Sequence, residues 1–161
     1  MKLKLAAAVL AATTACATPA LAADFTGPRV GATIGLADDD FGGSEVFTYG
    51  VNAGYDFDLG RAVVGGTIEY QDSSEDGVGR DLSATVRAGL KASENVLVYG
   101  LVGYTNLGIE DTDVELDGVR AGAGVEVALG SNAFGQVEYR YSNYEADVEG
   151  HQFVLGIGYR F

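Results

Sequence analysis

Apolar and polar residues alternate with a period of two through most of the chain after residue 23. The last segment shows it best: one face carries Phe153, Leu155, Ile157, Tyr159 and Phe161, and the other carries Val154, Gly156, Gly158 and Arg160. Successive side chains of a β-strand point to opposite faces, so this alternation predicts a strand with one apolar face. No stretch after residue 23 has a convincing helical period, and we therefore predict an all-β protein.

Eight segments of this kind follow one another. They cover residues 30–36, 47–57, 64–70, 82–92, 96–106, 119–129, 137–141 and 153–161. The segment 96–106 is apolar on both faces, so alternation does not assign its inward side. The even number of strands is what a closed antiparallel barrel requires, and we predict an eight-stranded up-and-down barrel.

The connections between these segments alternate in length. The short ones are residues 58–61, 92–95 and 130–132, and the long ones are residues 37–45, 72–80, 107–117 and 145–150. Transmembrane barrels have short periplasmic turns at one end and longer external loops at the other. The spacing therefore predicts a barrel that spans the bacterial outer membrane.

A soluble barrel would also alternate, but with its apolar face inward. Here the polar face consists mostly of glycine with a few ionised groups, which suits the narrow lumen of eight strands. Aromatic residues fall at both ends of the apolar face, as expected at two membrane interfaces. We place Phe47, Tyr70, Tyr141 and Phe153 at the outer rim, and Phe57, Tyr159 and Phe161 at the inner rim. A lipocalin-like soluble binder remains the alternative, with the aromatic face inward.

The first residues have the pattern of an export signal. Lys2 and Lys4 precede a short apolar run, and Ala20-Leu21-Ala22 is a small-residue cleavage pattern. We therefore predict a signal peptide over residues 1–22 and a barrel domain over residues 23–161. The chain's one cysteine, Cys16, lies inside this leader, and a lipoprotein modified at Cys16 is the alternative.

Composition narrows the class further. The 161-residue chain carries a formal charge of −13, which argues against binding nucleic acid through a basic surface. Its 24 glycines show no collagen-like period, and 47% of its residues are hydrophobic, so collagen and disorder are both excluded.

The leader, the eight alternating strands and the terminal Gly158-Tyr159-Arg160-Phe161 together resemble the small outer-membrane barrels of the OmpA/OmpX transmembrane-domain and opacity-protein type. The resemblance implies a monomeric barrel in outer-membrane lipid with surface-exposed loops. It also implies that the barrel-assembly machinery recognises the closing strand, with Tyr159 and Phe161 as the signal.

Most basic residues fall on the face that we assign to the lumen. The expected lumen charges are Arg29, Asp56, Glu69, Arg87, Lys91, Arg120, Glu126, Glu138, Arg140 and Arg160. Charges in a narrow lumen must be paired or hydrated, because desolvating them alone costs several kcal/mol each. We expect a salt-bridge network that plugs the barrel. A narrow, porin-like path for small solutes is the alternative, and its net basic lining would favour anions.

The long connections are almost purely acidic. Their carboxylates are Asp38, Asp39, Asp40, Glu45, Asp72, Glu75, Asp76, Glu110, Asp111, Asp113, Glu115, Asp117, Glu145, Asp147 and Glu149. Oxygen ligands at this density could gather divalent cations, although none of the loops has EF-hand spacing. These loops could equally contact surface partners.

Catalysis has little support in the residues. The one histidine, His151, would need a serine such as Ser142 or Ser44, with Glu149 or Glu69 to orient it. Nothing in the sequence brings these residues together. With one histidine and no cysteine after the leader, a zinc site has too few ligands. We predict a protein that is not an enzyme and has no cofactor.

Overall fold

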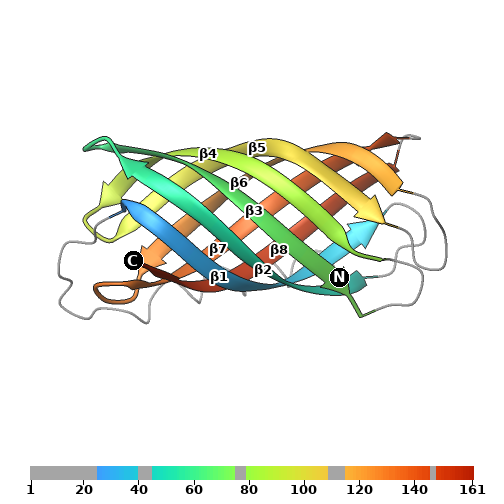
Figure 1. Cartoon of the computed structure of the whole chain (residues 1–161), viewed down its shortest axis with the longest axis horizontal. Coiled ribbons are helices and arrows are strands. Elements are labelled where there is room, and N and C mark those ends of the chain that lie inside the picture. The colour runs from blue at the N-terminus through green and yellow to red at the C-terminus, as the bar shows by residue number, and fades with distance from the viewer. Residues whose placement is uncertain (1–24, 40–44, 75–78, 109–114, 146–147) are drawn as a thin grey trace, which may run out of the picture.

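The structure is a computed structural model that describes residues 25–39, 45–74, 79–108, 115–145 and 148–161. Eight long strands, tilted relative to the barrel axis, form a closed cylinder (Figure 1). The strands are β1 (Gly27–Asp39), β2 (Glu45–Asp58), β3 (Ala62–Ser73), β4 (Asp81–Ser93), β5 (Val96–Gly108), β6 (Glu115–Ala128), β7 (Ala133–Tyr144) and β8 (Val148–Arg160). None of the helices among the described residues is long and apolar enough to cross a membrane.

Each strand pairs antiparallel with its neighbours in sequence, and β8 returns to β1 to close the sheet. The closing register pairs Val30 with Tyr159 and Leu36 with Phe153. Closure gives every strand a partner on both sides, so the barrel presents no open edge to lipid. The predicted eight-stranded antiparallel barrel is confirmed.

The two faces of the wall are inverted relative to a soluble protein. Val86 in the middle of β4 and Ile157 in the C-terminal half of β8 are 61% and 62% exposed on the outside, whereas Arg87 and Arg120 are buried inside. This is the arrangement that lipid imposes on a barrel, with apolar side chains outward and polar ones in the lumen. The inward and outward residues predicted for the seven clearly alternating strands are those observed.

Strand β5 is the one whose facing the sequence left open. Leu97, Tyr99 and Leu101 point into the lumen and are buried, while Val98 and Val102 are exposed on the outside. The lumen therefore contains apolar side chains as well as charges at this strand, which is why both faces of 96–106 are apolar.

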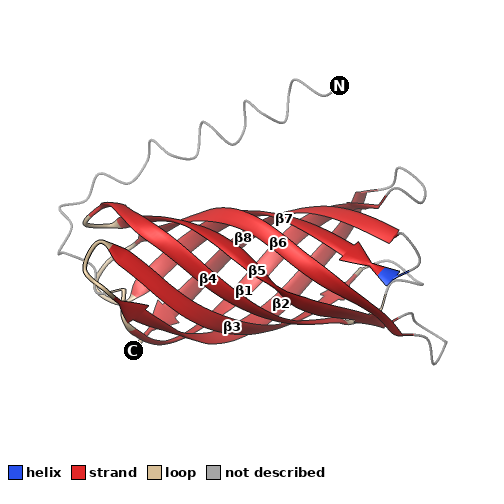
Figure 2. Ribbon diagram, turned by 90° about the horizontal axis from the view of Figure 1, so that it is seen from above, coloured by secondary structure: helices blue, strands red, loops and turns tan. Residues whose placement is uncertain are grey.

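Connections of different kinds gather at the two ends of the barrel. In Figure 2 the short turns, drawn in tan, lie together at one end with the C-terminus. We call this the turn end, and the opposite end the loop end. At the loop end the strands run further than predicted: Asp38, Asp39 and residues 115–117 belong to β1 and β6, not to loops. Apolar alternation stops where lipid stops, but backbone pairing continues in water.

Aromatic side chains line the outside near both ends. At the turn end the rings of Tyr159 and Phe161 lie 5.1 Å apart between centroids. At the loop-end half of β7 and β8, Tyr139 and Phe153 are also 5.1 Å apart. Tyr49, Tyr55, Tyr104 and Tyr139, which are not among the residues assigned to the two rims, are also exposed on the lipid face.

Candidate functional site

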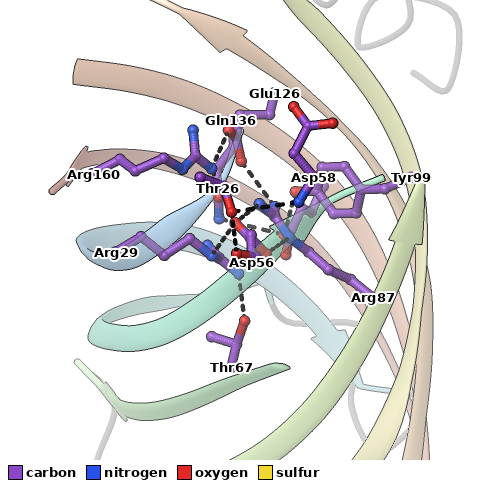
Figure 3. A network of polar contacts seen from close by, with 11 residues as sticks. Thr26, Arg29, Asp56, Asp58, Thr67, Arg87, Tyr99, Glu126, Gln136 and Arg160 are labelled. Atoms are coloured by element: carbon purple, nitrogen blue, oxygen red, sulfur yellow. Dashed lines mark hydrogen bonds and ion pairs between the residues drawn. The ribbon is translucent and has the colours of Figure 1, made fainter. Parts of the chain in front are cut away.

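Ion pairs cross the described part of the lumen, and the densest group surrounds Asp56 (Figure 3). Arg87 donates from Nε to Oδ1 of Asp56 at 2.9 Å and from Nη2 to Oδ2 at 2.5 Å. Arg160 donates from Nη2 to Oδ2 at 3.0 Å, and Nε of Arg29 lies 3.1 Å from the same oxygen. Three guanidinium groups from β1, β4 and β8 thus converge on one fully buried carboxylate of β2.

Glu126 of β6 is the second carboxylate in this group. It accepts from Nη1 of Arg87 and from Nη2 of Arg160, both at 2.8 Å. The guanidinium of Arg87 also lies 4.8 Å from the ring centroid of Tyr99, a cation–π distance. We call Arg29, Asp56, Arg87, Glu126 and Arg160 the Asp56 cluster. Its charges come from five strands, so it braces opposite walls of the barrel.

A second group occupies the middle of the lumen. Nη2 of Arg140 lies 2.9 Å from Oε2 of Glu69 and 2.5 Å from Oε2 of Glu138. Tyr99 donates its hydroxyl to Oε1 of Glu138 at 2.5 Å, and Thr33 donates to Oε1 of Glu69 at 2.8 Å. We call Glu69, Glu138 and Arg140 the Arg140 cluster. Each carboxylate has a cation and a hydroxyl donor, which offsets much of its desolvation cost.

A third group lies toward the loop end. Arg120 donates from Nη2 to Oδ2 of Asp81 and from Nε to Oγ of Ser142, at 2.8 and 2.9 Å. The hydroxyls of Tyr144 and Thr105 both donate to Asp81 at 2.7 Å. We call Asp81, Thr105, Arg120, Ser142 and Tyr144 the Arg120 cluster. It leaves the Asp81 carboxylate with three donors.

Lys91 forms an ion pair with Asp58 at the turn-end mouth, where both side chains are partly exposed. With Asp58 and Asp81 included, the described lumen holds six cations and six carboxylates. The cations are Arg29, Arg87, Lys91, Arg120, Arg140 and Arg160, and the carboxylates are Asp56, Asp58, Glu69, Asp81, Glu126 and Glu138. The net basic lining expected from the sequence is therefore wrong, and with it the physical ground for an anion preference.

Five polar lumen residues were not predicted from the sequence. Asp58 and Asp81 stand at strand ends next to predicted loops. Tyr99 and Thr105 belong to the segment of ambiguous facing, and Tyr144 stands at a strand end. Extending the period of two by one step from Asp56 and Ser83 would have placed both aspartates inward. The period of two, continued along the chain beyond the clearly alternating positions, is therefore the signal that could have identified the two aspartates.

Close packing explains why glycine is so frequent on the lumen face. A Cβ on Gly124 would lie 2.7 Å from Cζ of Tyr99 and 2.8 Å from Cγ of Glu138. Such contacts are shorter than carbon atoms tolerate, so a side chain at 124 would displace Tyr99 from its hydrogen bond with Glu138. The narrow lumen needs small residues opposite its large ones.

Among the described residues, His151 does not meet Ser142 or Glu69, which were considered with it for catalysis. His151 lies on the outer face, where its Nδ1 is 2.6 Å from the hydroxyl oxygen of Tyr139. Ser142 lies in the lumen and accepts from Arg120, and Glu69 is also buried there. The barrel wall thus separates His151 from both, while Ser44 lies outside the described residues.

The acidic loops are described only in part. Asp40, Glu75, Asp76, Glu110, Asp111, Asp113 and Asp147 lie outside the described residues, and so do the side chains of Asp39 and Glu45. Across the described ranges there is no group of three or more His, Cys, Asp or Glu residues that could hold a metal ion. Divalent-cation binding by the loops therefore stays a prediction.

The predicted assembly signal lies at the turn end. Tyr159 is exposed on the lipid face of β8, and the backbone N–H of Phe161 donates to the carbonyl of Pro28 at 3.0 Å. Phe161 itself is 70% exposed. Both aromatic side chains are accessible from outside the barrel, and their recognition by the assembly machinery stays a prediction.

A comparison with protein families decides the class of this barrel. Residues 8–161 match the model of the outer membrane protein beta-barrel domain. The chain belongs to this family. Its exposed apolar wall is therefore the surface of an outer-membrane barrel that faces lipid.

Individual outer membrane proteins are also similar to this chain. The 25 kDa outer-membrane immunogenic protein of Brucella ovis is 28% identical over 125 residues, which is 70% of this chain and 62% of that protein. The chain thus spans about three fifths of that relative's length. The N-terminal β-barrel domain of Pseudomonas aeruginosa OprF is 17% identical, with a TM-score of 0.64 over 84% of this chain and 99% of that one.

One similar structure is that of an enzyme. The outer membrane enzyme PagL is 16% identical, with a TM-score of 0.59 over 83% of this chain and 99% of the PagL chain. At this identity the likeness shows a shared fold alone.

Proposed function

We propose that this protein is a non-catalytic outer-membrane barrel whose lumen is closed by its ion pairs and whose loop end contacts surface partners. The observation that carries the proposal is the convergence of three arginines on Asp56, because it places paired charges from different strands across the lumen. The void beyond it, lined by Arg29, Glu138 and Arg140 among others, is only about 10 Å³. That is room for about one water molecule.

The plug and the absence of catalysis rest on separate arguments. A conducting path would need a file of mobile water past the Asp56, Arg140 and Arg120 clusters, and each cluster is held by bonds between strands. A catalytic serine would need a base, but His151 is across the wall from Ser142. A structural and interaction role is compatible with both a closed lumen and the lack of a serine–histidine pair.

Conductance in a planar bilayer tests the plug. We expect the refolded chain, confirmed as folded by its heat-dependent gel mobility, to give no discrete current steps. If the parent chain does give current steps, Arg87→Ala and Arg120→Ala should change their size only if the current passes through the lumen, where both arginines lie. Discrete steps from the parent chain that change in either variant would favour the narrow pore over the plug.

Cysteine labelling on intact cells tests which end faces outward. Glu115 at the loop end and Ser131 in a turn-end connection are both exposed. We expect an impermeant maleimide to label Glu115→Cys and to leave Ser131→Cys unlabelled until the cells are broken. The reverse pattern would place the acidic loop end in the periplasm and remove its role as a surface.

A further inference from the structure

An apolar layer crosses the lumen at the turn end, beyond the Asp56 cluster. Val63, Leu97 and Phe134 are each the second residue of a strand that follows a short turn, and each is buried in the lumen. Phe25, which precedes β1, is also fully buried and packs in one cluster with Val63 and Leu97. The layer thus takes one residue from each odd-numbered strand or its approach.

Phe25 differs from the other three because it is not part of a strand. Its backbone N–H donates to the carboxylate of Asp58. The side chains of Arg160 and Lys91 both lie 5.4 Å from its ring centroid, within cation–π range. The next residue, Thr26, donates its hydroxyl to the carbonyl of Asp56 at 3.2 Å.

A bend at Gly27 directs this segment into the barrel. Gly27 has φ of +110°, a backbone conformation that residues with a Cβ rarely adopt. A Cβ there would lie 2.6 Å from the carbonyl oxygen of Phe161. Glycine is therefore required both by the backbone angle and by the close approach of the last strand.

We propose that residues 25–27 form a latch that closes the turn-end mouth of the lumen, with Phe25 as its seal. The other members of the layer are fixed by strand pairing, so only Phe25 can leave without breaking the barrel. Its release would open a gap between Val63 and Leu97 and admit water to Arg160 and the Asp56 cluster.

A single cysteine in the layer would report the state of the latch. We would replace Cys16 by serine and introduce Val63→Cys, which is close to valine in size. With Phe25 in place, a small charged methanethiosulfonate should react slowly, since it must wait for a local opening. Phe25→Ala should raise the labelling rate at least about tenfold, and Gly27→Ala should do the same while retaining the phenylalanine.

Phe57→Ala is the matched control, because Phe57 is an aromatic residue at the same end but faces lipid. It should leave the labelling rate unchanged. Unchanged rates in both Phe25→Ala and Gly27→Ala, or an equal increase in Phe57→Ala, would overturn the latch. Cysteine labelling tests the latch, and bilayer conductance tests the ion-pair plug. Because the two measurements are independent, either proposal can be overturned while the other is supported.

Discussion

Asp56→Asn is expected to destabilise the folded barrel by about 3–5 kcal/mol, the range for removing one partner from a buried charge group. The substitution keeps the shape of the side chain and removes its charge. Arg29, Arg87 and Arg160 would then face each other with Glu126 as the remaining carboxylate of the Asp56 cluster. Urea unfolding in lipid vesicles, followed by the folded and unfolded bands on a gel, would measure the loss.

Asp58→Asn is the matched control for this prediction. Asp58 pairs with Lys91 at the mouth, where both are partly exposed, so its loss should cost at most about 1 kcal/mol. A double variant, Asp56→Asn with Arg29→Met, should recover part of the stability because it removes one cation along with the anion. Equal effects of the two asparagine substitutions would show that burial of the Asp56 cluster does not set the stability.

Val86→Arg should weaken insertion by about 2–4 kcal/mol, as expected for a cation near the middle of the lipid face. Val86 is central in β4 and points away from the lumen. Lipid can neither pair nor hydrate the new charge, and the side chain must reach for an interface. The measurement is the free energy of unfolding from vesicles, compared with Val86→Ala to separate the charge from the loss of volume.

Leu59→Arg makes the same change at the end of the barrel. Leu59 is exposed in the short connection after β2. An arginine there reaches the interface, so the expected cost is only about 0–1 kcal/mol. A penalty at residue 59 as large as that at residue 86 would contradict the depth dependence and the placement of the lipid face.

Most of the architecture could be predicted from local pattern. A period of two is a property of neighbouring residues, so Phe153 to Phe161 reveal their strand and its apolar and polar faces without any partner. The lengths of the connections distinguished the two ends of the barrel, because the short turns lie together at one end. Where lipid no longer demands alternation, as at Asp38 and residues 115–117, the pattern ended before the strand did.

The lumen charges show the limit of the same reasoning. Alternation identified Asp56, Arg87 and Glu126 as inward, but not that Arg87 would bond to both carboxylates. These contacts join residues 31 and 39 positions apart. They depend on the register of each strand pair and on closure of the sheet, neither of which is a property of one segment.

The strand count, the apolar and polar faces of seven strands and the charged character of the polar face could be predicted from the sequence, because they follow from the spacing of residues along each strand. The facing of residues 96–106, the balance of charge in the described lumen and the place of Phe25 became visible only in the folded barrel, because they depend on contacts between strands. Leu97 is apolar because it packs in the lumen with Phe25 and Val63, which come from other parts of the chain. Which of the two apolar faces of segment 96–106 turns inward is decided only when the barrel closes.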